Sequence, residues 1–278
     1  MAPHSSEAAA PWGGWLLAPV RLAYGVYAIS LFLLLALCTL TATLLLPGVE
    51  RRRGAARAMA RTFLALAGMP LTVKSPEHLP EGQCVVVSNH ASYLDGVVFT
   101  AALPPRFGFV IKREMAGVPL AGLLLRRLGS EFVERFNRQR GASDARRVLR
   151  NAVSGNSLVF FPEGTFTRTP GLLKFHTGAF LTAARARCPV IPAIVRGTRV
   201  ALSPNGGLPR PGRIVVELLP AVTMSPESPD AAATTLRDGA RGAILRQLGE
   251  PDLDPTYCAD TGRPPDTARA KSDPVSSI

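Results

Sequence analysis

Short apolar runs alternate with amphipathic stretches between about residues 70 and 220. The runs rich in valine, isoleucine, leucine and phenylalanine are predicted to be strands: 71–75, 84–89, 107–113, 130–135, 157–162, 190–197 and 212–219. Helical spacing predicts helices at 94–102, 119–129, 143–153, 178–187 and 231–249. Strands that alternate with helices favour an α/β fold with a largely buried sheet.

An uncharged apolar run at 22–46 precedes this region. At about 1.5 Å per residue, a helix of this length reaches past about 30 Å, the thickness of one hydrocarbon core. A signal peptide would have a shorter apolar run with basic residues before it. Here only Arg21 precedes immediately, and the basic cluster follows: Arg51, Arg52, Arg53, Arg57 and Arg61. We therefore expect a membrane anchor, either a simple span or a hairpin in one leaflet, with the following chain in the cytoplasm.

The stretch after this anchor predicts a basic helix. Met59, Phe63 and Leu66 recur at helical spacing, and Arg57 and Arg61 fall on another face. Such a helix either lies on anionic lipid headgroups or packs as an ordinary surface helix.

The chain is accordingly expected to divide into five segments. These are a leader at 1–21, a membrane-anchoring helical segment with the basic helix at 22–69, a folded domain at 70–225, a C-terminal helix at 226–250 and a tail at 251–278. The tail is rich in proline, aspartate, threonine and serine and has no apolar period, which predicts disorder.

The net charge of +12 suits an anionic partner, such as nucleic acid, an acidic membrane surface or a phosphorylated substrate. A nucleic-acid-binding protein would show a basic stripe with interleaved aromatics. Aromatic residues make up only 6% of the chain and many lie in the apolar N-terminal segment, so no nucleic-acid partner is expected. The four cysteines lie far apart, without a CxxC pair, which disfavours zinc and a disulfide framework and fits a reducing compartment.

A histidine and an aspartate flank the turn after one predicted strand. His90 follows three valines, a serine and an asparagine, and Asp95 falls at the start of the next helix. In a continuous helix, residues five apart point about 140° away from each other, so the pair meets only if 90–94 form a turn. Asp95 would then accept from Nδ1–H and leave Nε2 free as a base. The alternative is a histidine that forms only structural hydrogen bonds.

A second strand, at 157–162, also ends in a polar turn. Glu163 there is suited to binding a hydroxyl or cationic group. Gly164 permits close backbone approach, and the amides of Gly164 and Thr165 are candidates for an anion-binding nest. The alternative is a simple turn. Further along, Pro192 lies inside a predicted strand, which marks an edge strand or a bulge.

These stretches together resemble one family, the glycerolipid acyltransferases, which includes the bacterial 1-acylglycerol-3-phosphate acyltransferases. "NHASYLD" (89–95) is similar to the family's first motif, "FPEGT" (161–165) to the third and "VIPAIV" (190–195) to the fourth. The stretch from "KREM" to "SEFVER" looks like the second, with Lys112 and Arg135 in place of the family's lysine and arginine. Order and spacing match over about residues 70–220.

The resemblance implies a mixed, largely buried sheet flanked by helices, with an acyltransferase domain at 70–225. It implies that His90 is the general base, oriented by Asp95, on a lysophospholipid hydroxyl. Attack on an acyl-CoA or acyl carrier protein thioester would need no covalent intermediate and no cofactor or metal. The absence of a GxSxG nucleophile elbow in the sequence agrees. The remaining implied site residues are Glu163 and Gly164 for catalysis and Lys112, Arg135, Thr165, Arg168 and Pro192 for substrate binding.

One residue departs from the family pattern. Phe166 stands where the third motif usually continues into an arginine that binds the acceptor phosphate, and Arg168 comes two residues later. Either Arg168, or Arg135 with Lys112, takes the phosphate, or the acceptor is another lysolipid such as lysophosphatidylethanolamine or an aminolipid. A lipid-binding protein without turnover is a further alternative, which the intact His90, Asp95, Glu163 and Gly164 disfavour. The expected location is the cell's inner membrane, with the domain on the cytoplasmic side.

Overall fold

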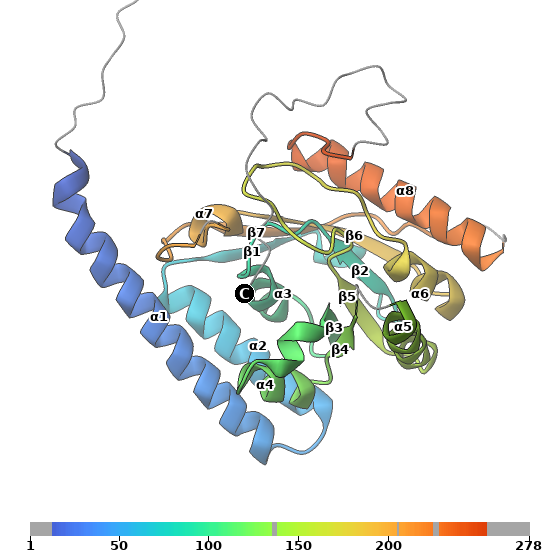
Figure 1. Ribbon diagram of the computed structural model, residues 1–278, viewed down its shortest axis with the longest axis horizontal. Helices are drawn as coiled ribbons and strands as arrows, with labels where there is room; N and C mark the ends of the chain where they lie inside the picture. Colours follow the sequence, from blue (N-terminus) through green and yellow to red (C-terminus); the bar gives the residue numbers. More distant parts are fainter. Residues whose placement is uncertain (1–12, 135–137, 205, 225–227, 255–278) are drawn as a thin grey trace, which may run out of the picture.

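The computed structural model describes residues 13–134, 138–204, 206–224 and 228–254 (Figure 1). Within this part of the chain, one seven-stranded sheet has the order β1-β7-β6-β2-β5-β3-β4. Its strands are β1 (Leu71–Lys74), β2 (Val85–Ser88), β3 (Phe107–Lys112), β4 (Glu131–Val133), β5 (Ser157–Phe160), β6 (Val190–Arg196) and β7 (Ile214–Leu218). The β6–β7 pair is antiparallel and the other neighbouring pairs are parallel, so the predicted mixed sheet is confirmed.

Helices cover both faces of the sheet (Figure 1). They are α1 (Gly13–Leu45), α2 (Val49–Leu66), α3 (Asp95–Ala102), α4 (Ala121–Arg127), α5 (Arg138–Val153), α6 (Gly178–Ala186), α7 (Thr198–Ala201) and α8 (Pro229–Leu248), with the 3-10 turns η1 (Pro76–His78) and η2 (Arg113–Gly117). Side chains alternate between the two faces along a strand, so β2 contributes side chains to a hydrophobic core on each face of the sheet. Val86 packs with Phe63 and Phe99 of α2 and α3, whereas Val85 and Val87 pack on the α6 and α8 side.

The first two helices form an antiparallel hairpin against the domain (Figure 1). Helix α1 begins at Gly13 rather than at residue 22, and its stretch Ala18–Leu45 is long and apolar enough to cross a membrane. Contacts hold it along its length. The Tyr24 hydroxyl donates to the Ala67 carbonyl over 2.7 Å near one end, and Arg127 donates to the Thr43 carbonyl near the other. The helix therefore lies along the domain.

Helix α2 packs between α1 and α3, and arginines of the basic cluster bind the domain. Arg53 donates to the carbonyls of Leu128, Arg106 and Gly129 over 2.8–3.2 Å. Arg61 donates to the Ala101 carbonyl. Because these guanidiniums are bonded to carbonyls of the protein, the structure favours the packed surface helix over one that lies freely on headgroups.

Pro192 lies in a central strand, at an irregularity in the register. Strand β6 is bonded on both sides, to β2 and to β7, so the edge-strand alternative is wrong. Val190 and Ala193 are three positions apart, whereas their partners Val222 and Leu218 are four positions apart. This extra residue is a bulge on the β7 side, as the other alternative predicts. Pro192 has no N–H, and its carbonyl accepts from the Leu219 amide over 2.8 Å.

The C-terminal helix is followed by a short docked segment, which corrects the predicted boundary of the tail. Residues 251–254 are part of the fold: Asp252 pairs with the nearly buried Arg241 of α8, and the Leu172 amide donates to the Pro251 carbonyl over 2.9 Å. The predicted disorder from residue 251 is therefore wrong for these four residues, because the composition gives no sign of their long-range partners. The rest of the predicted tail, 255–278, lies outside the described residues.

Candidate active site

Polar residues gather at the carboxyl ends of neighbouring parallel strands, the usual place for a site in an α/β sheet. His90 follows β2, Glu163 follows β5 and Lys112 ends β3. Strand order places these strands side by side as β2-β5-β3. Residues separated by more than seventy positions in the sequence therefore meet at one edge.

His90 and Asp95 are joined by a short hydrogen bond. The turn after β2 brings Nδ1 of His90 within 2.7 Å of Oδ2 of Asp95, the first residue of α3. The same oxygen accepts from the amides of Ala91 and Ser92 over 2.7 and 2.9 Å. Asp95 is fully buried, and its place at a helix N-terminus stabilises the carboxylate. Because Nδ1 is bonded to Asp95, Nε2 on the other side of the imidazole ring points away from Asp95.

Hydrogen bonds hold the turn itself in place. The side-chain amide of Asn89 exchanges two hydrogen bonds with the backbone of Val195 on β6, over 2.8 and 3.1 Å. The Ser92 hydroxyl donates to the Leu202 carbonyl over 2.7 Å. Both residues are buried. These bonds fix the turn to β6 and α7 and so limit the positions open to the His90 ring.

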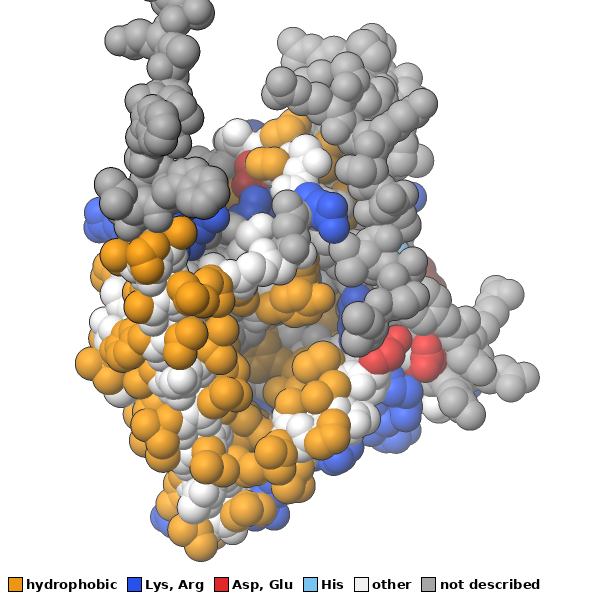
Figure 2. All heavy atoms as spheres, turned by 60° about the vertical axis from the view of Figure 1, so that its left-hand side comes forward, with side chains coloured by type: hydrophobic (Ala, Val, Ile, Leu, Met, Phe, Trp, Pro, Cys, Tyr) orange, Lys and Arg blue, Asp and Glu red, His pale blue; other side chains and the backbone are white. Residues whose placement is uncertain are grey.

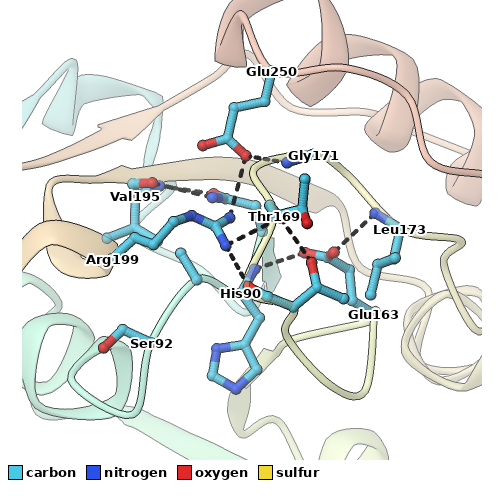
Figure 3. A network of polar contacts seen from close by, with 12 residues as sticks. His90, Ser92, Glu163, Thr169, Gly171, Leu173, Val195, Arg199 and Glu250 are labelled. Atoms are coloured by element: carbon cyan, nitrogen blue, oxygen red, sulfur yellow. Dashed lines mark hydrogen bonds and ion pairs between the residues drawn. The ribbon is translucent and has the colours of Figure 1, made fainter. Parts of the chain in front are cut away.

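Glu163 ties the same turn to the loop after β5. Its Oε1 accepts from the His90 amide over 2.6 Å, and its Oε2 accepts from the Leu173 amide over 2.9 Å. Figure 3 shows the His90 backbone facing Glu163 while the imidazole ring points away from this network. Both carboxylate oxygens of Glu163 therefore accept from backbone amides.

Burial raises the pKa of Glu163 to about 7, from an ordinary value of 4.5. The side chain is only 4% exposed, so removal from water disfavours the charged form. The two amide bonds and the nearby charge of Arg199 act in the opposite direction and limit the rise. Glu163 therefore changes charge near neutral pH.

Aromatic rings enclose the imidazole. Phe161 stacks on His90 with 4.4 Å between ring centroids, and Phe166 meets it edge-on at 4.6 Å. Phe166 also contacts the exposed Tyr93 at 4.8 Å. The residue in place of the family's arginine thus forms an apolar wall beside the candidate base.

The loop that carries Phe166 is held by two residues that motif reasoning missed. Arg199 of α7 donates to the carbonyls of Thr167 and Thr169 over 2.5 and 3.3 Å. Its other nitrogen lies 3.3 Å from Glu250, which accepts from the Gly171 amide over 2.7 Å (Figure 3). The only signal in the sequence is an arginine soon after the proline-bearing strand, which is too common to single out Arg199.

A cavity of about 1420 Å³ begins at His90 and extends between α1, α2, α3 and α4. Its walls are mainly apolar and include Phe32, Leu35, Met59, Phe63, Val97, Phe107, Leu124 and Leu125. Its polar lining residues include His90, Lys112, Thr165 and Arg168. A large apolar cavity with a few convergent polar groups suits a ligand that is apolar along most of its length.

The other predicted site residues fall into three groups. Lys112, Gly164, Thr165 and Arg168 line the cavity, and Lys112 and Arg168 are exposed. The Gly164 amide donates to the Phe161 carbonyl over 3.0 Å, so the predicted nest lacks one of its two donors. Pro192 is buried within β6 and is not among the residues that line the cavity. Arg135 lies outside the described residues.

Comparisons with known proteins agree with this geometry. The sequence model of the family described as Acyltransferase matches residues 70–196. A protein named 1-acyl-sn-glycerol-3-phosphate acyltransferase from Salmonella typhimurium is 30% identical over 203 residues, which cover 71% of this chain and 80% of that one. The chain belongs to the acyltransferase family.

The acyltransferase is also 28% identical over 171 residues to a 1-acyl-sn-glycerol-3-phosphate acyltransferase of Saccharomyces cerevisiae. The match covers 60% of this chain and only 56% of the yeast protein, so the chain spans little more than half the length of that relative. Among solved structures, the LPA acyltransferase PlsC from Thermotoga maritima matches with a TM-score of 0.60 at 20% identity, over 82% of this chain and 96% of that one. That likeness shows a shared fold.

Proposed function

We propose that this acyltransferase moves an acyl chain from acyl-CoA or acyl carrier protein to the free hydroxyl of a lysophospholipid. The acceptor proposed first is 1-acylglycerol-3-phosphate, which gives phosphatidic acid. The observation that carries the proposal is the 2.7 Å bond between His90 Nδ1 and Asp95 at the mouth of a large apolar cavity. The names of the Salmonella and yeast relatives support the choice of acceptor.

The proposed chemistry is direct transfer. Nε2 of His90 takes the proton of the acceptor hydroxyl as its oxygen attacks the carbonyl carbon of the thioester. The carbon–sulfur bond then breaks, the ester remains, and the leaving thiolate takes the proton back from the imidazolium. Asp95 stabilises the imidazolium that forms between these steps and holds the ring in one orientation. No bond between enzyme and acyl chain is needed.

A phosphomonoester acceptor needs a cation near the site, because burying its charge unpaired costs several kcal/mol. Lys112 and Arg168 supply exposed positive charges on the cavity wall. We propose these two, together with Arg135, as the phosphate-binding residues. The apolar wall formed by Phe166 supports a second candidate, a zwitterionic lysolipid, whose headgroup has less need of an arginine at that position.

We further propose that α1 anchors the enzyme in the cell's inner membrane with the domain on the cytoplasmic side. The apolar stretch Ala18–Leu45 and the arginines that follow it support this placement. Contacts of Tyr24 and Thr43 with the rest of the protein favour a hairpin held in one leaflet over a helix that crosses alone. Protease added outside intact spheroplasts should leave residues 70–278 uncut, and cleavage there would contradict the orientation.

The test of function is an acyl-transfer assay on the purified full chain. The wild type is offered lysophosphatidic acid, lysophosphatidylethanolamine and lysophosphatidylcholine, each with acyl-CoA and with acyl carrier protein as donor. Transfer to lysophosphatidic acid with the highest kcat/KM supports the first acceptor. A preference for a zwitterionic lysolipid replaces it with the second, and transfer to none of them contradicts the proposal.

Variants then test the phosphate contact. Lys112→Ala and Arg168→Ala should each raise KM for lysophosphatidic acid by roughly tenfold or more, since bonds to charged groups contribute about 1.5–3 kcal/mol. The same variants should change KM for lysophosphatidylethanolamine less, because its phosphate carries one charge fewer. Arg185→Ala is a matched control, because that arginine lies on α6 and not on the cavity wall. Unchanged KM values in both variants would remove these residues from the phosphate site.

A further inference from the structure

A second apolar surface lies beside the cavity, at the bend between η2 and α4. We call residues 115–123 the elbow. Its large apolar side chains are exposed: Met115 (37%), Val118 (43%), Leu120 (65%) and Leu123 (39%). Soluble proteins rarely expose large apolar patches, so a cluster of this kind in one short bend indicates a contact surface.

The backbone of the elbow is strained, and the strain holds an apolar side chain outward. Leu120 has a φ of 60° and a ψ of −50°, a conformation that a leucine rarely adopts. Gly122 allows the bend to close, since a Cβ there would lie 2.4 Å from the Ala116 carbonyl oxygen. Arg126 donates to the same oxygen over 2.9 Å. An exposed leucine in a strained position contributes little to the core, and strain of this kind often marks a functional contact.

The elbow faces the same side as the membrane helix. Arg127 of α4 donates to the carbonyls of Thr43 and Leu44, which fixes α4 to one end of α1. The outward face of α1 is apolar, with Leu33, Leu34 and Leu37 more than half exposed. Figure 2 shows hydrophobic side chains along α1 and a second group of them across a hollow. Because α4 is bonded to one end of α1, the elbow lies near the surface that we assign to the bilayer.

The hollow between the two surfaces belongs to the cavity. Phe32, Leu35 and Ala36 of α1 form one wall, and Met115 and Ala121 of the elbow lie on the other. An opening between two lipid-facing walls lets an acceptor pass sideways from the leaflet to His90 while its chain stays in an apolar environment. This route avoids moving a long acyl chain through water, which is unfavourable by about 0.8 kcal/mol for each CH₂.

We propose that the elbow inserts into the same leaflet as α1 and forms the second lipid-facing wall of a lateral opening for the acceptor. The occupant of this surface is the acyl-chain region of a phospholipid bilayer. The proposal rests on the proposed function in that the acceptor is a membrane lipid. The insertion itself can be measured without any turnover.

The first experiment locates the elbow by fluorescence. In a background with Trp12→Phe and Trp15→Phe, single tryptophans are introduced as Leu120→Trp and Val118→Trp, with Val153→Trp on α5 as a control of similar exposure. Val118 has an ordinary φ of −72°, so its variant remains informative if the change at the strained position prevents folding. Vesicles of phosphatidylcholine and phosphatidylglycerol carrying brominated acyl chains should quench the elbow tryptophans several-fold more than the control. Equal quenching at the three positions, or none at the elbow, would overturn the proposal.

The second experiment measures the consequence for turnover. Leu120→Asp and Val118→Asp should raise KM at least tenfold for long-chain lysophosphatidic acid in vesicles, and Val153→Asp should not. All three should leave the reaction with a short-chain, monomeric acceptor unchanged, because neither elbow side chain lines the cavity. A defect with both acceptors, or one confined to reactions with acyl carrier protein, would instead show a structural or donor-docking role and overturn the proposal. If the wild type is inactive with every acceptor, the proposed function is refuted. The quenching experiment would still show whether the elbow inserts into the bilayer.

A third variant separates folding from lipid contact. Leu120→Gly removes the strain together with the side chain, because glycine accepts a positive φ. It should raise the Tm by roughly 2–4 °C and at the same time raise KM for the vesicle acceptor. A raised Tm with unchanged kinetics on vesicles would show that Leu120 has no role at the lipid surface.

Discussion

The backbone amide of His90 donates to the Glu163 carboxylate over 2.6 Å, although the two residues are 73 positions apart. The bond joins the turn after β2 to the loop after β5 and so couples the position of the candidate base to that of the loop beside it. Both oxygens of Glu163 are engaged by backbone amides. We therefore expect Glu163 to act as a positioning residue, with its effect on transfer exerted through the position of the imidazole.

Replacing the carboxylate should reduce transfer without unfolding the protein. In Glu163→Gln the side-chain NH₂ replaces one accepting oxygen and faces a backbone N–H as a second donor, so one charge-assisted bond is lost. The loss of about 1.5–3 kcal/mol predicts a decrease of roughly 10- to 100-fold in kcat/KM. Glu217→Gln is the control, since Glu217 is also paired but lies on β7 away from the cavity. Equal activity in Glu163→Gln and wild type would contradict the positioning role.

The raised pKa of Glu163, about 7 against 4.5, predicts a pH dependence of stability. Between these values the folded protein holds a proton that the unfolded chain has lost. The contribution of Glu163 to the free energy of unfolding therefore falls as pH rises from about 4.5 to 7, at up to about 1.4 kcal/mol per pH unit. Glu163→Gln lacks this contribution, so its stability relative to wild type should increase over that window in urea titrations at several pH values. A constant difference would show that Glu163 titrates normally.

Removal of the imidazole should abolish most of the transfer. General-base assistance contributes about 10²- to 10⁴-fold, so His90→Ala should lower kcat by that order. Asp95→Asn should be nearly as harmful, because the ring loses its anionic partner at 2.7 Å. Circular dichroism and vesicle binding check that both variants stay folded and membrane-bound. Transfer at the wild-type rate by His90→Ala would refute its role as the base.

Arg199 should act on acceptor binding and on the pH profile together. Arg199→Gln frees the carbonyls of Thr167 and Thr169, so the loop beside Phe166 loosens and KM for the acceptor should rise by roughly tenfold. The substitution also removes a positive charge that lowers the pKa of Glu163, so the acidic limb of the kcat/KM profile should move to higher pH. Glu250, which loses its partner Arg199, raises the pKa of Glu163 and so acts in the same direction, whereas the bonds from the His90 and Leu173 amides remain.

A matched arginine tests whether that effect is specific. Arg196 also pairs with a glutamate, Glu217 at 2.7 Å, but it does not contact the loop. Arg196→Gln should leave both KM and the pH profile as in wild type. A similar change in the two variants would point to a general loss of stability.

The docked C-terminal segment should contribute strongly to stability. Asp252→Asn leaves the guanidinium of Arg241, only 8% exposed, with Asp254 at 4.0 Å as its remaining anionic partner, and breaking a buried pair costs about 3–5 kcal/mol when no partner is left. Because Asp252 is itself 18% exposed, we expect about 2–3 kcal/mol in urea titrations. Asp238→Asn on the same helix is the control, since Asp238 is 61% exposed and its pair with Arg237 should contribute less than about 1 kcal/mol. Equal effects of the two substitutions would show that residues 251–254 are bound weakly.

The strands and the histidine turn could be predicted because their signals are local. Three consecutive valines followed by Ser88 and Asn89 indicate both a buried strand and its end. The contact of His90 with Asp95 then needs only a turn between them. The same holds for the bulge near Pro192, which follows from the missing N–H of a single residue.

The remaining features depend on partners far away in the chain. Nothing near Glu250 in the sequence indicates that it meets Arg199 and the Gly171 amide. The arginines after α1 likewise look like a headgroup-binding cluster until Arg53 is seen bonded to three carbonyls of the domain. Composition gives the number of charges in a segment, whereas the tertiary fold determines which groups those charges bind.

Residues 251–254 also affect the order in which contacts form during synthesis of the chain. The ribosome makes α1 before this segment, and folding proceeds from the N-terminal side during synthesis. The Leu172 amide and Glu250 acquire their partners only when both ends of that interval exist. The nascent chain can thus reach the membrane while the loop beside His90 still lacks its final support. The contacts of residues 250–254 with this loop are therefore among the last that the domain acquires during synthesis.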